Sequence, residues 1–168
     1  YTLQIIEDQK TKVGINTHLT NKIVYDALIK GAIKNFKHTK NIQQEVKFGE
    51  NTRFDFLLTE KTKKTFLEVK NVTLSREKSI AEFPDAITER GLKHLIELST
   101  LPTKSVRAVM LFLVQRDDCG KFKIAADIDS KYADTFKKVK KMGVEPLCYD
   151  CSFGRNGINV NKKIKVLN

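Results

Sequence analysis

Residues 53–71, RFDFLLTEKTKKTFLEVKN, decide how the 168-residue chain folds. The runs FDFLL and TFLEV are rich in aromatic, β-branched and long apolar residues, as is typical of two buried strands. The connection between them, TEKTKK, has no apolar residue and is short enough for a β-hairpin. With an even-numbered loop centred between Lys61 and Thr62, paired residue numbers sum to 123. This register predicts that Asp55 faces Glu68 across the ladder.

Two carboxylates side by side need positive charge nearby. Directly opposite residues of an antiparallel pair have Cα atoms roughly 4.5 to 5.5 Å apart, where like charges destabilise the pair. Lys70 projects from the same face as Glu68, because it lies two residues further along the strand. One ammonium does not neutralise two carboxylates in a partly desolvated site, so we expect a divalent cation. Mg²⁺ or Mn²⁺ suits a site made of carboxylates, waters and phosphate oxygens.

This Asp-x12-Glu-x-Lys arrangement predicts a metal-dependent phosphodiesterase. In that interpretation Asp55 and Glu68 hold the metal, with the backbone carbonyl of Val69 as a further ligand. The metal lowers the pKa of a bound water and polarises the scissile phosphate, while Lys70 orients the nucleophile or neutralises the transition state. The alternative is an exposed Glu68–Lys70 ion pair on an edge strand with Asp55 in a turn, in a chain that is 30% charged. Their placement inside apolar runs favours the functional interpretation, because unpaired charge there is costly.

Other polar side chains are candidates for the same site. Glu45 precedes the hairpin on a predicted strand, either as a further carboxylate of the site or as a solvated partner of Lys47. Arg53 shares a strand face with Asp55 and can reach a phosphate. Gln115 ends the apolar strand that contains AVMLFLV, and it either enters the site or only closes that strand.

A predicted helix, AITERGLKHLIELS, follows the sequence FPD, with Asp85 as its expected N-cap. Arg90 and Lys93 lie in its first turns, where a helix N-terminus can receive a phosphate. The alternative is ordinary capping and solvated charge. We therefore treat both side chains as candidate DNA contacts.

Five segments resemble a known family. GINTHLTNKIVYDAL, EVKFGENTRFDFLL, FLEVKNVTL, FPDAITERGLKHL and AVMLFLVQR occur in the order and spacing of the sugar fermentation stimulation protein A family. The resemblance runs from about Tyr1 to Tyr149, and the blocks EVKNVTL and FPDAITERGLKHL are highly specific. It implies binding to DNA without marked sequence preference, a link to maltose metabolism, and a PD-(D/E)xK nuclease-like domain.

The family's motif residues correspond to Asp55, Glu68 and Lys70, in agreement with the hairpin argument. Phe54 stands where the motif's name has proline, which leaves the carboxylate in place. Asn16 lies in a block shared with the family, so the resemblance implies a supporting role near the site. Family members usually carry an N-terminal OB-like domain, which we expect to be absent from this chain.

The charge balance predicts a polyanionic partner, with DNA first. Lysine and arginine number 31 against 20 acidic residues, so the formal net charge is +11 and the pI about 9.6. The alternative is a generally lysine-rich composition without such a partner. No run of 18 apolar residues and no secretion signal occurs, so we expect no membrane association and a cytoplasmic location.

The cysteines predict reduced thiols rather than a zinc site. Cys119, Cys148 and Cys151 are an odd number in a chain without a secretion signal. Cys148-x-x-Cys151 is half of a zinc motif, but no second pair accompanies it. We also expect no small-molecule cofactor.

The predicted order is strands, helix, three strands, helix, strand, helix, strand, and a closing hairpin around Asn156-Gly157. This order contains αβββαβ, so we expect an α/β fold with a mixed central sheet flanked by helices, a restriction-endonuclease-like core. The whole chain, 1–168, is expected to form one domain. The expected function is DNA cleavage dependent on Mg²⁺ or Mn²⁺. The alternative is a non-enzymatic, non-sequence-specific DNA-binding regulator of sugar metabolism.

Overall fold

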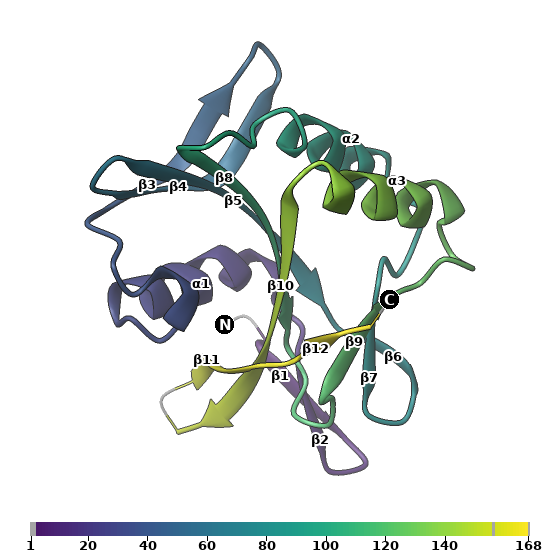
Figure 1. The fold of residues 1–168 in the computed structure, drawn as a ribbon. Coiled ribbons are helices and arrows are strands. Elements are labelled where there is room, and N and C mark those ends of the chain that lie inside the picture. Colours follow the sequence, from purple (N-terminus) through teal and green to yellow (C-terminus); the bar gives the residue numbers. More distant parts are fainter. Residues whose placement is uncertain (1–2, 156, 168) are drawn as a thin grey trace.

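A six-stranded mixed sheet forms the centre of the structure (Figure 1). The computed structural model describes residues 3–155 and 157–167. The strand order is β11-β10-β8-β5-β4-β3, in which β8 runs parallel to both of its neighbours and the other pairs are antiparallel. The strands are β3 (Asn41–Phe48), β4 (Thr52–Glu60), β5 (Lys63–Val72), β8 (Val106–Val114), β10 (Val144–Gly154) and β11 (Gly157–Lys163). The α/β class and the mixed sheet are as the sequence predicts.

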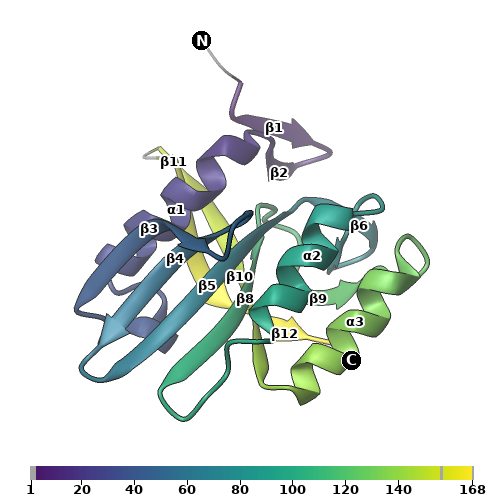
Figure 2. The same cartoon turned by 90° about the horizontal axis from the view of Figure 1, so that it is seen from above.

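Each face of this sheet has its own hydrophobic core. Helix α1 (Thr20–Ile29) covers one face, and α2 (Glu89–Leu98) with α3 (Ser130–Lys141) covers the other (Figure 2). Alternate residues of β8 enter the two cores, as expected for a strand buried on both faces. The α1-side core receives Val109, Leu111 and Leu113. The α2–α3-side core receives Ala108, Met110, Phe112 and Val114.

The central hairpin has the predicted register. β4 and β5 pair from Glu60↔Lys63 to Phe56↔Leu67, and every pair sums to 123. Lys61, in the turn, has a φ of +47°, which a tight connection requires. The ladder ends at Phe56, one residue short of Asp55. The sequence therefore predicts the pairing of the two strands correctly, but it does not predict that the ladder ends before the Asp55 carboxylate.

A second, four-stranded sheet lies beside the central one, in the order β12-β9-β7-β6 (Figure 1). Its strands are short: β6 (Leu74–Glu77), β7 (Ile80–Phe83), β9 (Lys121–Ile124) and β12 (Lys165–Val166). β9 includes the last residues of the polar segment RDDCGKFK, which has no strand-like apolar pattern. β9 pairs in parallel with β7, which is distant in sequence, so no local pattern indicates this pairing.

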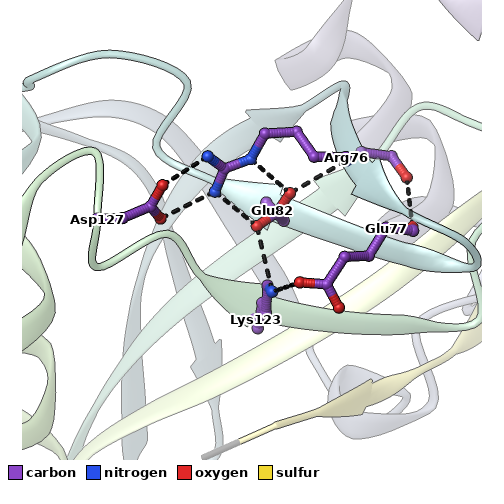
Figure 3. A network of polar contacts seen from close by, with 6 residues as sticks. Arg76, Glu77, Glu82, Lys123 and Asp127 are labelled. Atoms are coloured by element: carbon purple, nitrogen blue, oxygen red, sulfur yellow. Dashed lines mark hydrogen bonds and ion pairs between the residues drawn. The ribbon is translucent and has the colours of Figure 1, made fainter.

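Charged side chains hold the second sheet to the rest of the molecule (Figure 3). Arg76 donates to both oxygens of the buried Glu82, at 2.9 Å each, and to both oxygens of Asp127, at 2.6 and 2.9 Å. Lys123 bridges Glu77 and Glu82. The hydrogen bonds from Arg76 hold the pKa of Glu82 below its usual value despite burial. The network thus joins three strands to the loop before α3.

Side-chain caps precede three of the helical segments, and one of these caps differs from the predicted residue. Asn16 Oδ1 accepts from the backbone N–H of His18 and opens the short 3₁₀ helix η1 (Thr17–Leu19) just before α1. α2 begins at Glu89, because Thr88 caps it and not Asp85 as predicted: Thr88 Oγ1 accepts from Gly91 N–H. Asp129, the N-cap of α3, also accepts from Thr88 N–H and fixes that start.

The remaining elements lie at the chain ends and after α1. They are β1 (Ile5–Asp8), β2 (Thr11–Gly14) and the 3₁₀ helix η2 (Lys34–Phe36). β10 and β11 form the predicted closing hairpin with Gly154↔Gly157, and β11 is an edge strand. Asn156, in its predicted turn, lies outside the described residues.

Candidate functional site

A pocket of about 520 Å³ contains the three predicted catalytic side chains. Asp55, Glu68 and Lys70 all line it, from the adjacent strands β4 and β5. Its remaining walls come from β3, from η1 and the start of α1, and from α2. α1 and α2 lie on opposite faces of the sheet (Figure 2). The pocket therefore opens where the hairpin meets both helical layers.

The strand alternation breaks at Asp55. Phe54 packs in the α2–α3-side core, whereas Phe56, two residues later, packs in the α1-side core. On the neighbouring strand, Glu45 lies between the residues paired with these two phenylalanines and has a φ of +54°, which is uncommon for a residue with a side chain. Both strands are thus irregular at the same level. This irregularity, and not a regular ladder position, orients the Asp55 carboxylate.

The Asp55 carboxylate is fixed by two donors. Its Oδ2 accepts from the backbone N–H of Val69, and its Oδ1 from the side-chain amide of Asn21 on α1, both at 2.7 Å. The predicted ladder pair with Glu68 is therefore replaced by a side-chain contact to the next residue of β5. Burial, followed by the charge of Glu68, raises the pKa of Asp55 to about 6 despite these hydrogen bonds. The two carboxylates share the pocket and interact electrostatically, as predicted.

Glu68 is buried, with 3% of its surface exposed. Its Oε1 accepts from Lys70 Nζ at 2.7 Å and lies 2.5 Å from His94 Nδ1. Its Oε2 is buried and has no hydrogen-bond partner among the described residues. Burial acts to raise the pKa of Glu68, but His94 and Lys70 outweigh it and hold the pKa below its usual value. The exposed ion pair on an edge strand, the alternative interpretation, is wrong because β5 lies between β4 and β8.

The candidate metal ligands fit a hard divalent cation in part. A buried carboxylate oxygen without a partner is costly, and a cation would satisfy it. Within the described ranges, no three His, Cys, Asp or Glu side chains are grouped so as to hold a metal. The protein would therefore supply two carboxylates, Asp55 and Glu68, and leave the other positions to water or substrate, as Mg²⁺ commonly requires. Val69 lines the pocket, and its N–H is the donor to Asp55.

Glu45 and Arg53 line the same pocket. Arg53 Nη1 lies 3.7 Å from Glu45 Oε2, and both side chains are exposed. An exposed ion pair of this kind contributes little stability, so Arg53 is available to a phosphate. Glu45 thus lies beside the site, as the first of the two alternatives predicted. Its ion-pair partner is Arg53 and not Lys47.

Gln115 and Asn16 stabilise residues that line the pocket. Gln115 is fully buried and donates to Asn71 Oδ1 at 2.6 Å and to Thr20 Oγ1 at 3.0 Å. Asn71 and Thr20 line the pocket, so Gln115 positions its wall and does not enter it. Asn16 caps η1, whose residue Thr17 also lines the pocket.

A basic groove of about 530 Å³ adjoins the pocket. Arg53, Arg90 and His94 line both, while Lys47 and Lys93 extend the groove away from the carboxylates. Lys93 Nζ also donates to the backbone carbonyl of Asn51 at 3.3 Å. The structure thus brings together Arg53, Arg90 and Lys93, the predicted DNA contacts, on one continuous surface.

His94, like the Asp55 partner Asn21, is a site residue that the sequence analysis missed. It lies on the inward stripe of α2 with Gly91, Leu95 and Leu98, all of them buried. A histidine at helical spacing among apolar residues needs a polar partner in the core, and that spacing could have indicated it. The partner here is Glu68.

A zinc site at the cysteines is excluded by their positions. Cys148 packs in the α2–α3-side core and Cys151 in the α1-side core, so the sheet separates them. All three cysteines are free and buried. Burial raises the pKa of Cys151 to about 12, so its thiol is protonated at neutral pH.

None of the helices in the described part of the chain has the length and apolarity needed to cross a bilayer.

The structure is similar to that of SfsA from Pyrococcus furiosus, described as a complex with Ca²⁺, with a TM-score of 0.90 and 27% identity. That similarity covers all of this chain and 72% of the other.

Sequence comparison agrees with this structural similarity. The sugar fermentation stimulation protein homologues of Pelagibacter ubique and Rhodospirillum centenum are 46% and 42% identical to the chain. These matches cover 100% and 99% of the chain and 72% of each relative. The family model described as "Sugar fermentation stimulation protein RE domain" matches residues 18–157. The chain belongs to the sugar fermentation stimulation protein family.

Proposed function

We propose that this chain binds DNA and hydrolyses its phosphodiester bonds with a divalent metal ion. The observation that carries the proposal is Glu68. Its buried carboxylate shares a pocket with Asp55 and Lys70, and its Oε2 lacks a partner within the described part of the chain. A protein that only bound DNA would gain nothing from two carboxylates in such a position, because they repel phosphate.

The residues divide into metal ligands and phosphate contacts. Asp55 and Glu68 would hold Mg²⁺ or Mn²⁺, which supplies a water of lowered pKa and polarises the scissile phosphate when bound. The Pyrococcus furiosus relative is described with Ca²⁺, which takes oxygen ligands as Mg²⁺ does. Lys70 carries the charge that neutralises the phosphate in the transition state. With a pKa of about 6, Asp55 is ionised at neutral pH and ready to bind a cation.

The groove favours a nucleic-acid substrate over a small phosphate ester. Lys47, Arg53, Arg90 and Lys93 extend along it from the carboxylates. Contacts to several successive phosphates give affinity without base recognition, which matches binding without marked sequence preference. We place this activity in the cytoplasm, where thiols such as the three buried free cysteines remain reduced.

The second candidate is a non-enzymatic DNA-binding regulator of sugar metabolism. The groove itself favours it, because binding needs only the basic side chains. In this account the carboxylates have a structural role.

Incubation of plasmid and single-stranded DNA with the protein and Mg²⁺ or Mn²⁺ separates the two candidates. The matched variants are Glu68→Gln, which removes one charge at the site, and Asp134→Asn, which removes one exposed charge on α3. Cleavage by wild type and Asp134→Asn but not by Glu68→Gln supports the nuclease. No cleavage by wild type, with DNA binding retained, supports the regulator.

A further inference from the structure

We propose that His94 is a positioning residue that holds Glu68 when Lys70 leaves it for the reacting phosphate, an inference that rests on the nuclease function proposed above. The observation is that two donors converge on one carboxylate oxygen. Lys70 Nζ lies 2.7 Å and His94 Nδ1 2.5 Å from Glu68 Oε1. Both donors therefore bind Oε1, whereas Oε2 is buried and has no hydrogen-bond partner among the described residues.

The two donors differ in how firmly they are held. His94 is 7% exposed and lies on α2 between Gly91 and Leu95, on the stripe that packs against the sheet. Its imidazole has a short, rigid connection to a packed helix. Lys70 reaches Oε1 through a flexible four-carbon stem from the same strand as Glu68. His94 is therefore the fixed donor and Lys70 the movable one.

Lys70 cannot neutralise a transition state while its charge is used by Glu68. If Lys70 were the only donor, its departure would leave Oε1 buried and unpaired, which is unfavourable. His94 keeps that oxygen hydrogen-bonded, so Lys70 can turn to the phosphate and Glu68 keeps its orientation. Both the neutral Nδ1–H tautomer and the imidazolium donate at this position.

The first test is the affinity of the DNA-free protein for Mn²⁺, measured by calorimetry in a double-mutant cycle of His94→Leu and Lys70→Met. In the presence of Lys70, His94→Leu should change the affinity less than about threefold, because Lys70 still holds Oε1. In the Lys70→Met background the same substitution should lower it at least about tenfold, as loss of a residue that orients a ligand commonly does. Equal losses in both backgrounds would overturn the proposal. This readout does not require cleavage, so it stands even if the nuclease function fails.

The second test is single-turnover cleavage at saturating Mn²⁺ and DNA. His94→Leu should lower the rate at least about tenfold with little change in DNA affinity, because Lys70 then stays on Glu68. Ile96→Ala, an exposed position on the same helix, is the control and should cut at the wild-type rate. A wild-type rate in His94→Leu would show that His94 only fills the core.

Two polar variants cover the case that His94→Leu does not fold. The amide of His94→Asn places a donor near the position of Nδ1, whereas that of His94→Gln places it near Nε2. We expect His94→Asn to retain most of the rate and His94→Gln to lose as much as His94→Leu. Equal rates for the two polar variants would contradict the role assigned to the Nδ1 contact.

Discussion

Asp55 Oδ2 lies 2.7 Å from the backbone nitrogen of Val69, just where the β4–β5 ladder has ended. The contact replaces the strand pairing expected with Glu68 and satisfies one backbone donor of β5. It also places the two carboxylates on neighbouring strands without making them ladder partners. Asp55 therefore has a structural role beside its proposed catalytic one, and its variants should show both.

Removal of either carboxylate should separate cleavage from binding. Asp55→Asn and Glu68→Gln are expected to abolish cleavage and to preserve or tighten DNA binding, because each removes negative charge beside the groove. Lys70→Ala should lose cleavage and also bind more weakly. Gel-shift titration beside a cleavage assay measures both. Wild-type cleavage in all three variants would show that the site is misassigned.

The raised pKa of Asp55 predicts how stability depends on pH. A carboxyl whose pKa rises from 3.8 to about 6 on folding binds a proton more tightly in the folded state. The contribution of Asp55 to the free energy of unfolding is therefore full below about pH 4 and is lost as the pH rises through about 6. In total it is on the order of 3 kcal/mol. Thermal denaturation of metal-free protein from pH 4 to 7 should show Asp55→Asn gaining stability relative to wild type. A difference in stability between Asp55→Asn and wild type that stays constant over this pH range would contradict the raised pKa.

The same pKa predicts competition between protons and metal. Mn²⁺ affinity of the wild type should fall as the pH drops below about 6, because the protonated Asp55 cannot bind a cation. Calorimetry at several pH values measures this. The variant Asp55→Asn should bind Mn²⁺ weakly and without that pH dependence.

DNA affinity should depend strongly on salt. Removal of one phosphate-binding side chain should reduce the slope of log K against log salt by about 0.9. Arg90→Gln and Lys93→Gln remove charge from the groove, so each should lower the slope by about that amount. Lys137→Gln, on the exposed face of α3, is the matched control and should leave it unchanged. Fluorescence anisotropy at several salt concentrations gives the slopes, and a salt-insensitive affinity would argue against a phosphate-binding groove.

The hydroxyl of Tyr132 should contribute nothing to stability. Tyr132 is fully buried, and its hydroxyl has no hydrogen-bond partner in the described part of the chain. Burial raises its pKa, so it stays protonated. Tyr132→Phe should therefore be neutral or raise the free energy of unfolding by about 1 kcal/mol. A loss of more than about 1 kcal/mol in denaturant unfolding would reveal a partner for this hydroxyl.

Local patterns were enough to predict most of the central sheet. The hairpin register follows from the position of the loop, and the burial of β8 on both faces follows from its continuous apolar run. The second sheet was not predictable in this way, because β9 pairs with residues distant in sequence and carries alternating lysines. The later start of α2 depends on Asp129, which reaches Thr88 only in the folded chain.

The site was predictable as a set of residue types but not in its geometry. Asp55, Glu68 and Lys70 share the pocket as expected. The break in alternation at Asp55 lies opposite Glu45, whose left-handed backbone conformation a glutamate does not indicate. The contact of His94 with Glu68 joins a helix to a strand, and only tertiary packing creates it.

The most direct test of the account is DNA cleavage as a function of Mn²⁺ concentration for wild type and Glu68→Gln, purified in parallel. If Glu68 holds a catalytic metal ion, cleavage by the wild type rises with Mn²⁺ and saturates, whereas Glu68→Gln stays at the level of buffer while still binding DNA. Equal cleavage by both proteins, or wild-type cleavage that is independent of Mn²⁺, would contradict it.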